Sequence, residues 1–251
     1  MSEITHLLEN PRLWRGSQRN TTAAAHGSIK SGYSALDRAL HSGGWPVAGS
    51  TELLCDYSGI GELSLLTPAL SSLSQQQTIV WLNPPFRPSA PALKQAGFRL
   101  NHCLFIETSS LTEQLWAGEE LLRSATCAAV LNWTGRQRLS DRDLRRLQLA
   151  AREHHCWHIH FRSENCRQQS SPAPLRIRLQ AGEQQLALEL FKQSGGPSGQ
   201  QLVLPRKPFL LHQQQPPSLW PVARKPLRRK SRLRLAQTRS RAQTAPLLEI
   251  H

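Results

Sequence analysis

The chain has 251 residues, of which 39% are hydrophobic and 19% charged, and its formal net charge is +14. This length suits one domain of ordinary size with extensions. No uninterrupted apolar run approaches the ~18 residues of a membrane span, and the polar start MSEITHLLEN does not have the form of a signal peptide. We therefore expect a cytosolic protein that does not bind membranes.

Positive charge is concentrated near the C-terminus. Residues 200–251 hold eleven Lys or Arg and one acid, which leaves only +4 of the +14 for the rest of the chain. Beyond Pro205 the sequence is rich in Pro, Gln and Arg and poor in apolar residues, which is typical of disorder. We predict three parts: an N-terminal helix and linker over residues 1–29, a core domain over residues 30–205, and a basic, disordered tail over residues 206–251.

The cysteines and histidines do not predict a metal site. Five cysteines are present, at least three of them in apolar runs of strand length, as expected for buried, reduced thiols in the cytosol. A tetrahedral zinc ion needs four convergent ligands. One segment is rich in candidate ligands, but it holds no C-x-x-C pair to anchor a site: His154, His155, Cys156, His158, His160 and Cys166.

Predicted strands and helices alternate along most of the chain. A short helix that ends before Pro11 and a polar linker at residues 16–29 precede the first element of the core. Ser110 and Ser140 each have the form of a helix N-cap, and Glu113 would complete a capping box with Ser110. In chain order, the core elements are a helix through Leu40, a strand at 51–55, a helix at 62–74 with a kink or stop at Pro68, a strand at 78–82, a helix at 91–96, a strand at 102–106, a helix at 110–126, a strand at 127–131, a helix at 140–153 and a strand at 157–161.

The pattern changes after residue 174. Residues 175–179 and 186–190 alternate strictly between apolar and polar residues, with a turn at 181–183 between them. This predicts an antiparallel hairpin with one solvated face, and residues 201–204 can add a further strand. Five β–α repeats followed by a hairpin predict an α/β fold with a mainly parallel sheet and helices on both faces. RecA-like P-loop cores have this layout.

The segment from residue 50 to 66 has the strand, glycine turn and helix of a phosphate-binding P-loop. When the last glycine of G-x-x-x-x-G-K-[ST] is placed on Gly61, Gly59 lies within the turn and Asp56 replaces the first glycine. Glu62 then replaces the lysine and Leu63 the Ser or Thr. Glu62 would lie in the first helical turn, where the dipole and the free N–H groups stabilise negative charge. A triphosphate would be repelled there by about 1 to several kcal/mol, and Leu63 cannot hold a metal.

The ends of two further strands also lack catalytic residues. Residues 83–85 are Asn-Pro-Pro, where RecA-type enzymes carry the glutamate that activates water. Asn132 and Trp133 follow the strand at 127–131, where a Walker B strand would end in an aspartate. We therefore predict no catalytic residues, no cofactor and no enzymatic activity.

Residues 32–61 fit the pattern G-x3-LD-x2-L-x2-GG-x-P-x2-G-x2-E-x6-G-x-G, which resembles the start of the ATPase core of RecA-type recombinases. Over residues 6–205 the chain resembles the ImuA family, RecA-like accessory proteins of translesion synthesis. The stretches that carry this resemblance are Leu13-Trp14-Arg15-Gly16, residues 32–49, residues 51–54 and 59–63, Pro84-Pro85, residues 91–93, and Leu115-Trp116 through Val130-Leu131. It implies a damage-inducible adaptor that contacts RecA and a Y-family-like polymerase partner.

A second family competes with this interpretation. Residues 65–161 are similar to SulA, the SOS cell-division inhibitor that blocks FtsZ assembly. SulA lacks the N-terminal region with residues 43–61 and lacks a long basic tail, and both are present here. The resemblance to ImuA is therefore preferred, and a SulA-like inhibitor is kept as the alternative.

The basic tail has two candidate partners. Its charge is dense enough to neutralise several DNA phosphates, and such binding would weaken steeply with salt and would bring the protein to the nucleoid. The stretch has no aromatic residues for base stacking, and interspersed leucines would equally allow it to fold onto a protein. The residues concerned are Arg224, Lys225, Arg228, Arg229, Lys230, Arg232 and Arg234.

Overall fold

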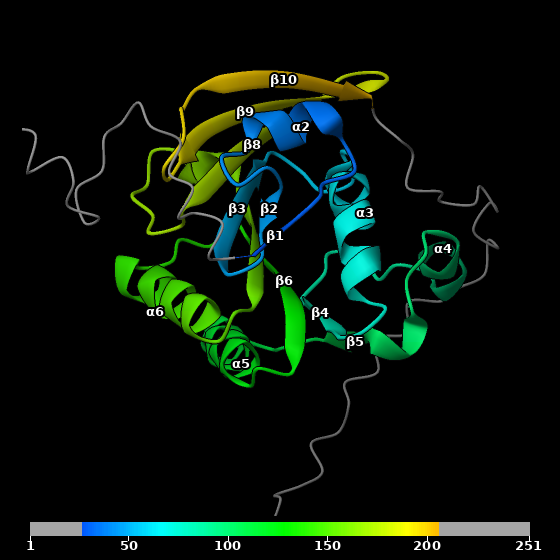
Figure 1. Ribbon diagram of the computed structural model, residues 1–251. Helices are drawn as coiled ribbons and strands as arrows, with labels where there is room; N and C mark the ends of the chain where they lie inside the picture. Colours follow the sequence, from blue (N-terminus) through cyan, green and yellow to red (C-terminus); the bar gives the residue numbers. More distant parts are fainter. Residues whose placement is uncertain (1–26, 206–251) are drawn as a thin grey trace, which may run out of the picture. The chain divides into compact units, whose positions relative to one another are not determined.

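The computed structural model describes residues 27–205, which form an α/β fold around one large sheet (Figure 1). Its eight strands are β3 (Gly49–Cys55), β4 (Thr78–Leu82), β5 (Cys103–Ile106), β6 (Cys127–Gly135), β7 (Trp157–Ser163), β8 (Leu175–Ala181), β9 (Gln185–Gln193) and β10 (Gln200–Pro205). They lie in the order β10-β9-β8-β3-β7-β6-β4-β5. Strands β3 to β8 pair in parallel, while β9 and β10 are antiparallel to their neighbours. The predicted fold class is confirmed.

Helices cover both faces of the sheet, as predicted. They are α2 (Ser34–Ala39), α3 (Glu62–Leu73), α4 (Ala90–Gln95), α5 (Leu111–Arg123) and α6 (Asp141–Glu153), with 3-10 turns η2 (Leu100–His102) and η3 (Glu164–Cys166). Apolar residues of α2, α3 and α4 pack on one face and those of α5 and α6 on the other. In Figure 1, α5 and α6 accordingly lie apart from α3 and α4.

The core between the sheet and α3 is apolar and aromatic. Alternate residues of the central strands point into it, because side chains of a strand alternate between the two faces. The Trp133 ring is stacked between Phe161, at 4.3 Å between ring centroids, and Trp81, at 5.9 Å. Aromatic pairs of this kind add roughly 0.5–1.5 kcal/mol beyond area burial, so β4, β6 and β7 are held together by their side chains as well as by their ladders.

Helix α3 continues through Pro68, so the predicted stop was wrong, and the predicted kink stays a prediction. Proline has no N–H and leaves the carbonyl of the residue four positions earlier without its helical donor. Here that carbonyl, of Ser64, accepts a hydrogen bond from the Tyr33 hydroxyl at 3.4 Å. Gly32 lies so close that a Cβ on it would be 2.7 Å from Pro68 Cβ. The segment before α2 therefore supports α3 at its weakest point.

The boundary of the core differs from the prediction at its N-terminal side. Residues 16–29 were predicted as a linker, but β1 (Ser28–Ile29) pairs antiparallel with β2 (Trp45–Pro46). A two-residue strand is too short to show a periodic pattern, and its partner is distant in sequence. The predicted N-terminal helix and the basic tail, with all its candidate binding residues, lie outside the described residues.

Local signals at helix ends were mostly reliable. The Ser110 hydroxyl accepts from the N–H of Glu113 at 3.2 Å, which confirms the N-cap. The capping box at this helix was wrong, because the Glu113 carboxylate bonds Ser109 N and Oγ instead of Ser110 N. At α6, Ser140 and Asp143 form a reciprocal capping box.

Within residues 27–205 no helix combines the length and apolarity that crossing a membrane requires.

Candidate functional site

The P-loop-like segment has the predicted strand, turn and helix. Strand β3 ends at Cys55 and helix α3 begins at Glu62, with the turn of residues 56–61 between them. Gly59 has a φ of 88° and Gly61, the N-cap of α3, a φ of 111°. Positive φ at both positions turns successive N–H groups toward the start of the helix, and such a concave set of N–H groups binds anions.

The anion in this turn is the protein's own Glu62. Its carboxylate accepts hydrogen bonds from Gly59 N at 2.9 Å and from Gly61 N at 3.1 Å. The residue is 3% exposed, so its charge is held inside the turn and does not extend into solvent. These N–H groups are of the kind that a P-loop offers to a phosphate. Glu62 therefore occupies the place that a nucleotide phosphate would need.

The charge around the turn is negative. Asp56, in the place of the first P-loop glycine, is exposed at the start of the turn. Burial raises the pKa of the Cys55 thiol to about 12, and the carboxylates of Glu62, Asp56 and Glu164 add to that effect. Residues 56–63 contain no cation. A triphosphate would meet this field with no lysine to offset it.

Leu63 belongs to the core and not to a metal site. Its side chain is partly buried and packs against the apolar cluster between the sheet and α3. Its main-chain carbonyl accepts from the Thr67 hydroxyl at 2.7 Å, inside α3. A Ser or Thr in this place would present an oxygen to a magnesium ion, and Leu63 has none to offer.

The side chain of Asn83, directly after β4, forms hydrogen bonds that hold the fold together. Its φ of 52° lies in the left-handed region, which asparagine tolerates better than most residues. Its Oδ1 accepts from Thr108 N at 2.7 Å and its Nδ2 donates to Thr108 Oγ1 at 2.8 Å. The side chain therefore joins the ends of β4 and β5, and an amide in this place is no general base.

Asn132 and Trp133 lie within a strand and not at its end. The predicted end at Leu131 was wrong, because β6 continues to Gly135. Asn132 is fully buried, and its Oδ1 accepts from Gln114 Nε2 at 2.6 Å. Trp133 points to the opposite face, where it stacks with Trp81 and Phe161. The pair is therefore packed into two cores on either side of β6, and its assignment as a degenerate Walker B end stays a prediction.

A buried ion cluster was missed by the sequence analysis. Glu52 on β3 is 1% exposed, and its carboxylate contacts Arg176 Nε at 2.7 Å and Arg162 Nη1 at 3.2 Å. The Ser171 hydroxyl donates to the same carboxylate at 2.5 Å. The alternation of residues 175–179 predicts Arg176 on the solvated face of a hairpin, which is wrong because β8 pairs with β3 and brings Arg176 onto Glu52. The available signal was an acid within an apolar strand.

Two buried histidines extend this polar layer along β7. The rings of His158 and His160 are stacked at 5.2 Å between centroids. His158 Nδ1 is 2.8 Å from Ser50 Oγ, and His160 Nε2 is 2.9 Å from Thr134 Oγ1. Burial is the main cause that lowers the pKa of both imidazoles well below 6.5, so both are neutral.

The predicted ligand-rich segment is not gathered into a metal site in the described part of the chain. No group of three or more His, Cys, Asp or Glu within residues 27–205 has an arrangement that could hold a metal ion. All five cysteines are free thiols and four of them are buried, as the sequence predicted for thiols in apolar strands. Burial also raises the pKa of the Cys156 thiol strongly, so this sulfur stays protonated.

Comparison with known proteins gives one family match and structural relatives. The family model described as cell division inhibitor SulA matches residues 55–157, which is less than half of the chain. This segment overlaps the region of predicted SulA similarity and runs from the end of β3 to the start of β7. The chain therefore contains a SulA-like segment, and the resemblance to SulA is supported at this level. No curated protein matches the chain.

Many solved structures are similar to the chain, among them a SulA protein and a recombinase. The crystal structure of SulA from Pseudomonas aeruginosa is 24% identical, with a TM-score of 0.38, and the match covers 45% of this chain and 97% of that one. The crystal structure of the RadB recombinase is 15% identical, with a TM-score of 0.56, and the match covers 72% of this chain and 97% of that one. The second likeness shows the fold. The described domain is a RecA-type core whose P-loop-like turn is filled by its own glutamate, and residues 55–157 of the chain carry a SulA-like segment.

Proposed function

We propose that this protein is a non-catalytic RecA-type accessory protein of the SOS response to DNA damage, which acts through protein contacts. The observation that carries the proposal is the Glu62 carboxylate bonded to Gly59 N and Gly61 N. The phosphate position of this scaffold is filled by a side chain that cannot dissociate. The protein would therefore act through its surfaces, by binding other proteins. The match to the SulA model and the RecA-type fold support a role in DNA damage.

The more specific form of the proposal is an adaptor in translesion synthesis, between RecA and a polymerase complex with a Y-family-like partner. It is supported by what lies outside the SulA-like segment. Helix α2 and the β1–β2 pair precede that segment, and strands β8, β9 and β10 follow it and widen the sheet. These additions pack on the core itself: the Tyr33 hydroxyl bonds Ser64 O in α3, and Arg176 bonds Glu52. They give the adaptor surface that a SulA-like segment alone lacks.

A second candidate function is inhibition of cell division by binding FtsZ. The specific observation that favours it is the family match itself, which lies on residues 55–157 and is described as a cell division inhibitor. This function needs no nucleotide either, so the filled turn fits both candidates. The two differ in their partners.

Recovery of partners from damaged cells tests the proposal. A tagged full-length chain expressed from its own promoter would be crosslinked before and after DNA damage, and bound proteins identified by mass spectrometry. We expect RecA and a polymerase partner, enriched after damage. Recovery of FtsZ without either would establish the second candidate and overturn the first. An unrelated tagged protein of similar charge is the control for contacts made by the basic tail.

A further inference from the structure

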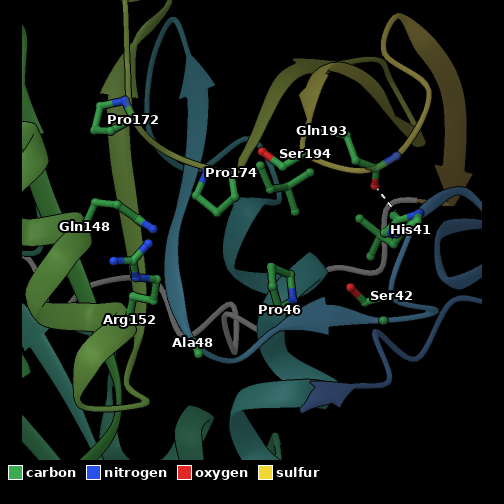
Figure 2. A pocket seen from close by; sticks show the side chains of 13 residues that line it. His41, Ser42, Pro46, Ala48, Gln148, Arg152, Pro172, Pro174, Gln193 and Ser194 are labelled. Atoms are coloured by element: carbon green, nitrogen blue, oxygen red, sulfur yellow. Dashed lines mark hydrogen bonds between the residues drawn. The ribbon is translucent and has the colours of Figure 1, made fainter. Parts of the chain in front are cut away.

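A cavity of about 360 Å³ lies at the other end of β3 from the P-loop-like turn (Figure 2). Ala48, which directly precedes β3, is in its wall, whereas the turn follows the end of β3 at Cys55. The cavity is therefore separate from any nucleotide position. Its lining includes Leu40, Pro46, Gln148, Arg152, Pro174 and Gln193.

The wall of this cavity is held by hydrogen bonds between distant segments. Gln148 Oε1 accepts from Ser50 N at 2.6 Å, which ties α6 to β3. Gln193 Oε1 accepts from His41 N at 2.8 Å, which ties the end of β9 to the segment after α2 (Figure 2). Prolines contribute much of the remaining wall and have no N–H to satisfy. The cavity is thus preformed, as sites for side chains or small ligands usually are.

One face of α6 leads to the cavity and carries unpaired positive charge. Arg142, Arg145 and Arg152 are exposed and stand at i, i+3 and i+10, so they share one face of the helix. None of the three forms an ion pair within residues 27–205. Arg146, on the flank toward α5, does pair, with Glu119. The guanidinium groups of the three outer arginines therefore form no ion pair, although the exposed acids Asp141 and Glu153 belong to the same helix. Arg152 also lines the cavity.

An apolar side chain lies among these arginines. Leu149 is 43% exposed on the same face, one turn after Arg145 and just before Arg152. The cavity also has an apolar wall, to which Leu40, Pro46 and Pro174 belong. Three cations beside a cavity with an apolar wall match a chain segment that has acidic residues and at least one apolar anchor. Arg145 and Arg152 are about 10 Å apart along the helix axis, a distance that an extended peptide spans in about three residues.

We propose that this surface, the α6 groove (Arg142, Arg145, Leu149, Arg152 and the cavity lining), binds an acidic peptide segment of a partner protein. An apolar side chain of the segment enters the cavity, and its carboxylates pair with the arginines. Nucleic acid fits less well, because none of the residues that line the cavity is Phe, Tyr or Trp, on which bases stack. The inference does not depend on the proposed function, since it does not involve the P-loop-like turn. The α6 residues of the groove lie within the SulA-like segment, and most of the cavity lining lies outside it.

Peptide binding by the full-length chain tests this proposal. The probe is a fluorescein-labelled peptide of alternating Glu and Ser with one leucine, measured by fluorescence anisotropy. Its companion has alanine in place of that leucine. The test variant is R145A/R152A, and its matched control is R228A/R229A, which removes two arginines from the basic tail. We expect the first to weaken probe binding by about tenfold and the second by much less.

Two further measurements separate the groove from charge alone. Ser194→Trp fills the cavity without changing net charge, and the Ser194 N–H that donates to Pro174 O is main chain and is kept. We expect it to abolish the preference for the leucine probe over the alanine probe. Equal losses in both arginine variants, or no preference for leucine in the unmodified chain, would overturn the proposal. So would an oligothymidylate of similar length that binds more tightly than the peptide and depends on Arg145 and Arg152.

Discussion

Glu52 on β3 and Arg176 on β8 face each other across a parallel strand pair, with 2.7 Å between the carboxylate oxygen and the guanidinium Nε. Arg162 contacts the same carboxylate, and all three side chains are almost fully buried. One acid thus balances two cations inside the domain. Removing one partner of such a cluster leaves buried charge without compensation.

Substitution Glu52→Gln should therefore destabilise the domain by about 3–5 kcal/mol. Chemical denaturation followed by tryptophan fluorescence would measure this. The matched control is Glu107→Gln, which breaks the exposed Arg87–Glu107 pair and should change stability by about 0–1 kcal/mol. Similar small effects of both substitutions would show that the cluster does not depend on the charge of Glu52.

Stability should fall as the pH drops below about 6.5. Burial lowers the pKa of His158 and His160 well below 6.5, so the folded protein keeps both neutral. Below pH 6.5 these histidines bind protons in the unfolded chain but not in the folded chain. Each of them therefore lowers the free energy of unfolding by up to about 1.4 kcal/mol per pH unit. Above 6.5 both states are neutral at these positions and the slope from them disappears.

Two variants test whether His160 causes this pH dependence. His160→Gln can keep a hydrogen bond to Thr134 and should flatten the slope below pH 6.5, measured by urea denaturation across the pH range. His155→Asn is the control, because His155 is exposed with a φ of 52° that asparagine also adopts. The control should keep the slope. An unchanged slope in His160→Gln would show that His160 is already charged in the folded state or that other groups dominate.

Gly32→Ala should cost more than backbone strain alone. Gly32 has a φ of 83°, and a Cβ there would be 2.7 Å from Pro68 Cβ, in a rigid ring. Gly135→Ala is the control, since its φ is 59° and nothing lies within 4 Å of its added Cβ. Strain alone costs about 1–2 kcal/mol, and the clash should add about 1–3 kcal/mol. Equal losses in thermal unfolding would mean that the contact between Gly32 and α3 relaxes freely.

Substitution Glu62→Ala should open the turn without creating an enzyme. The N–H groups of Gly59 and Gly61 would lose the carboxylate, so weak binding of pyrophosphate is expected where the unmodified chain shows none in calorimetry. No ATP turnover is expected in either, because Leu63 holds no metal and Asn83 is no general base. Asp56→Ala removes an exposed charge without opening the turn and is the control. ATP hydrolysis by the unmodified chain that is lost in Glu62→Ala would contradict our account.

The sequence predicted the order of the strands and helices, because periodic apolar runs and caps such as Ser110 and Ser140 are local signals. The sequence also predicted that Glu62 lies at the free N–H groups of α3, because its position in the first helical turn and its negative charge were enough to infer this. It could not predict the Glu52 cluster, whose arginines follow more than a hundred residues later. The cavity was likewise missed, because its wall combines loops that only the strand order brings together.

The filled turn sets how the protein can be controlled. In an ordinary P-loop protein, binding and release of a nucleotide move the turn between two states. The conformation of the protein surface then responds to the nucleotide concentration in the cell. The Glu62 carboxylate cannot diffuse away, and its local concentration is the same in a starved cell and in a growing one. A change in nucleotide concentration therefore gives this turn no ligand to exchange, and a nucleotide cannot switch the scaffold through it.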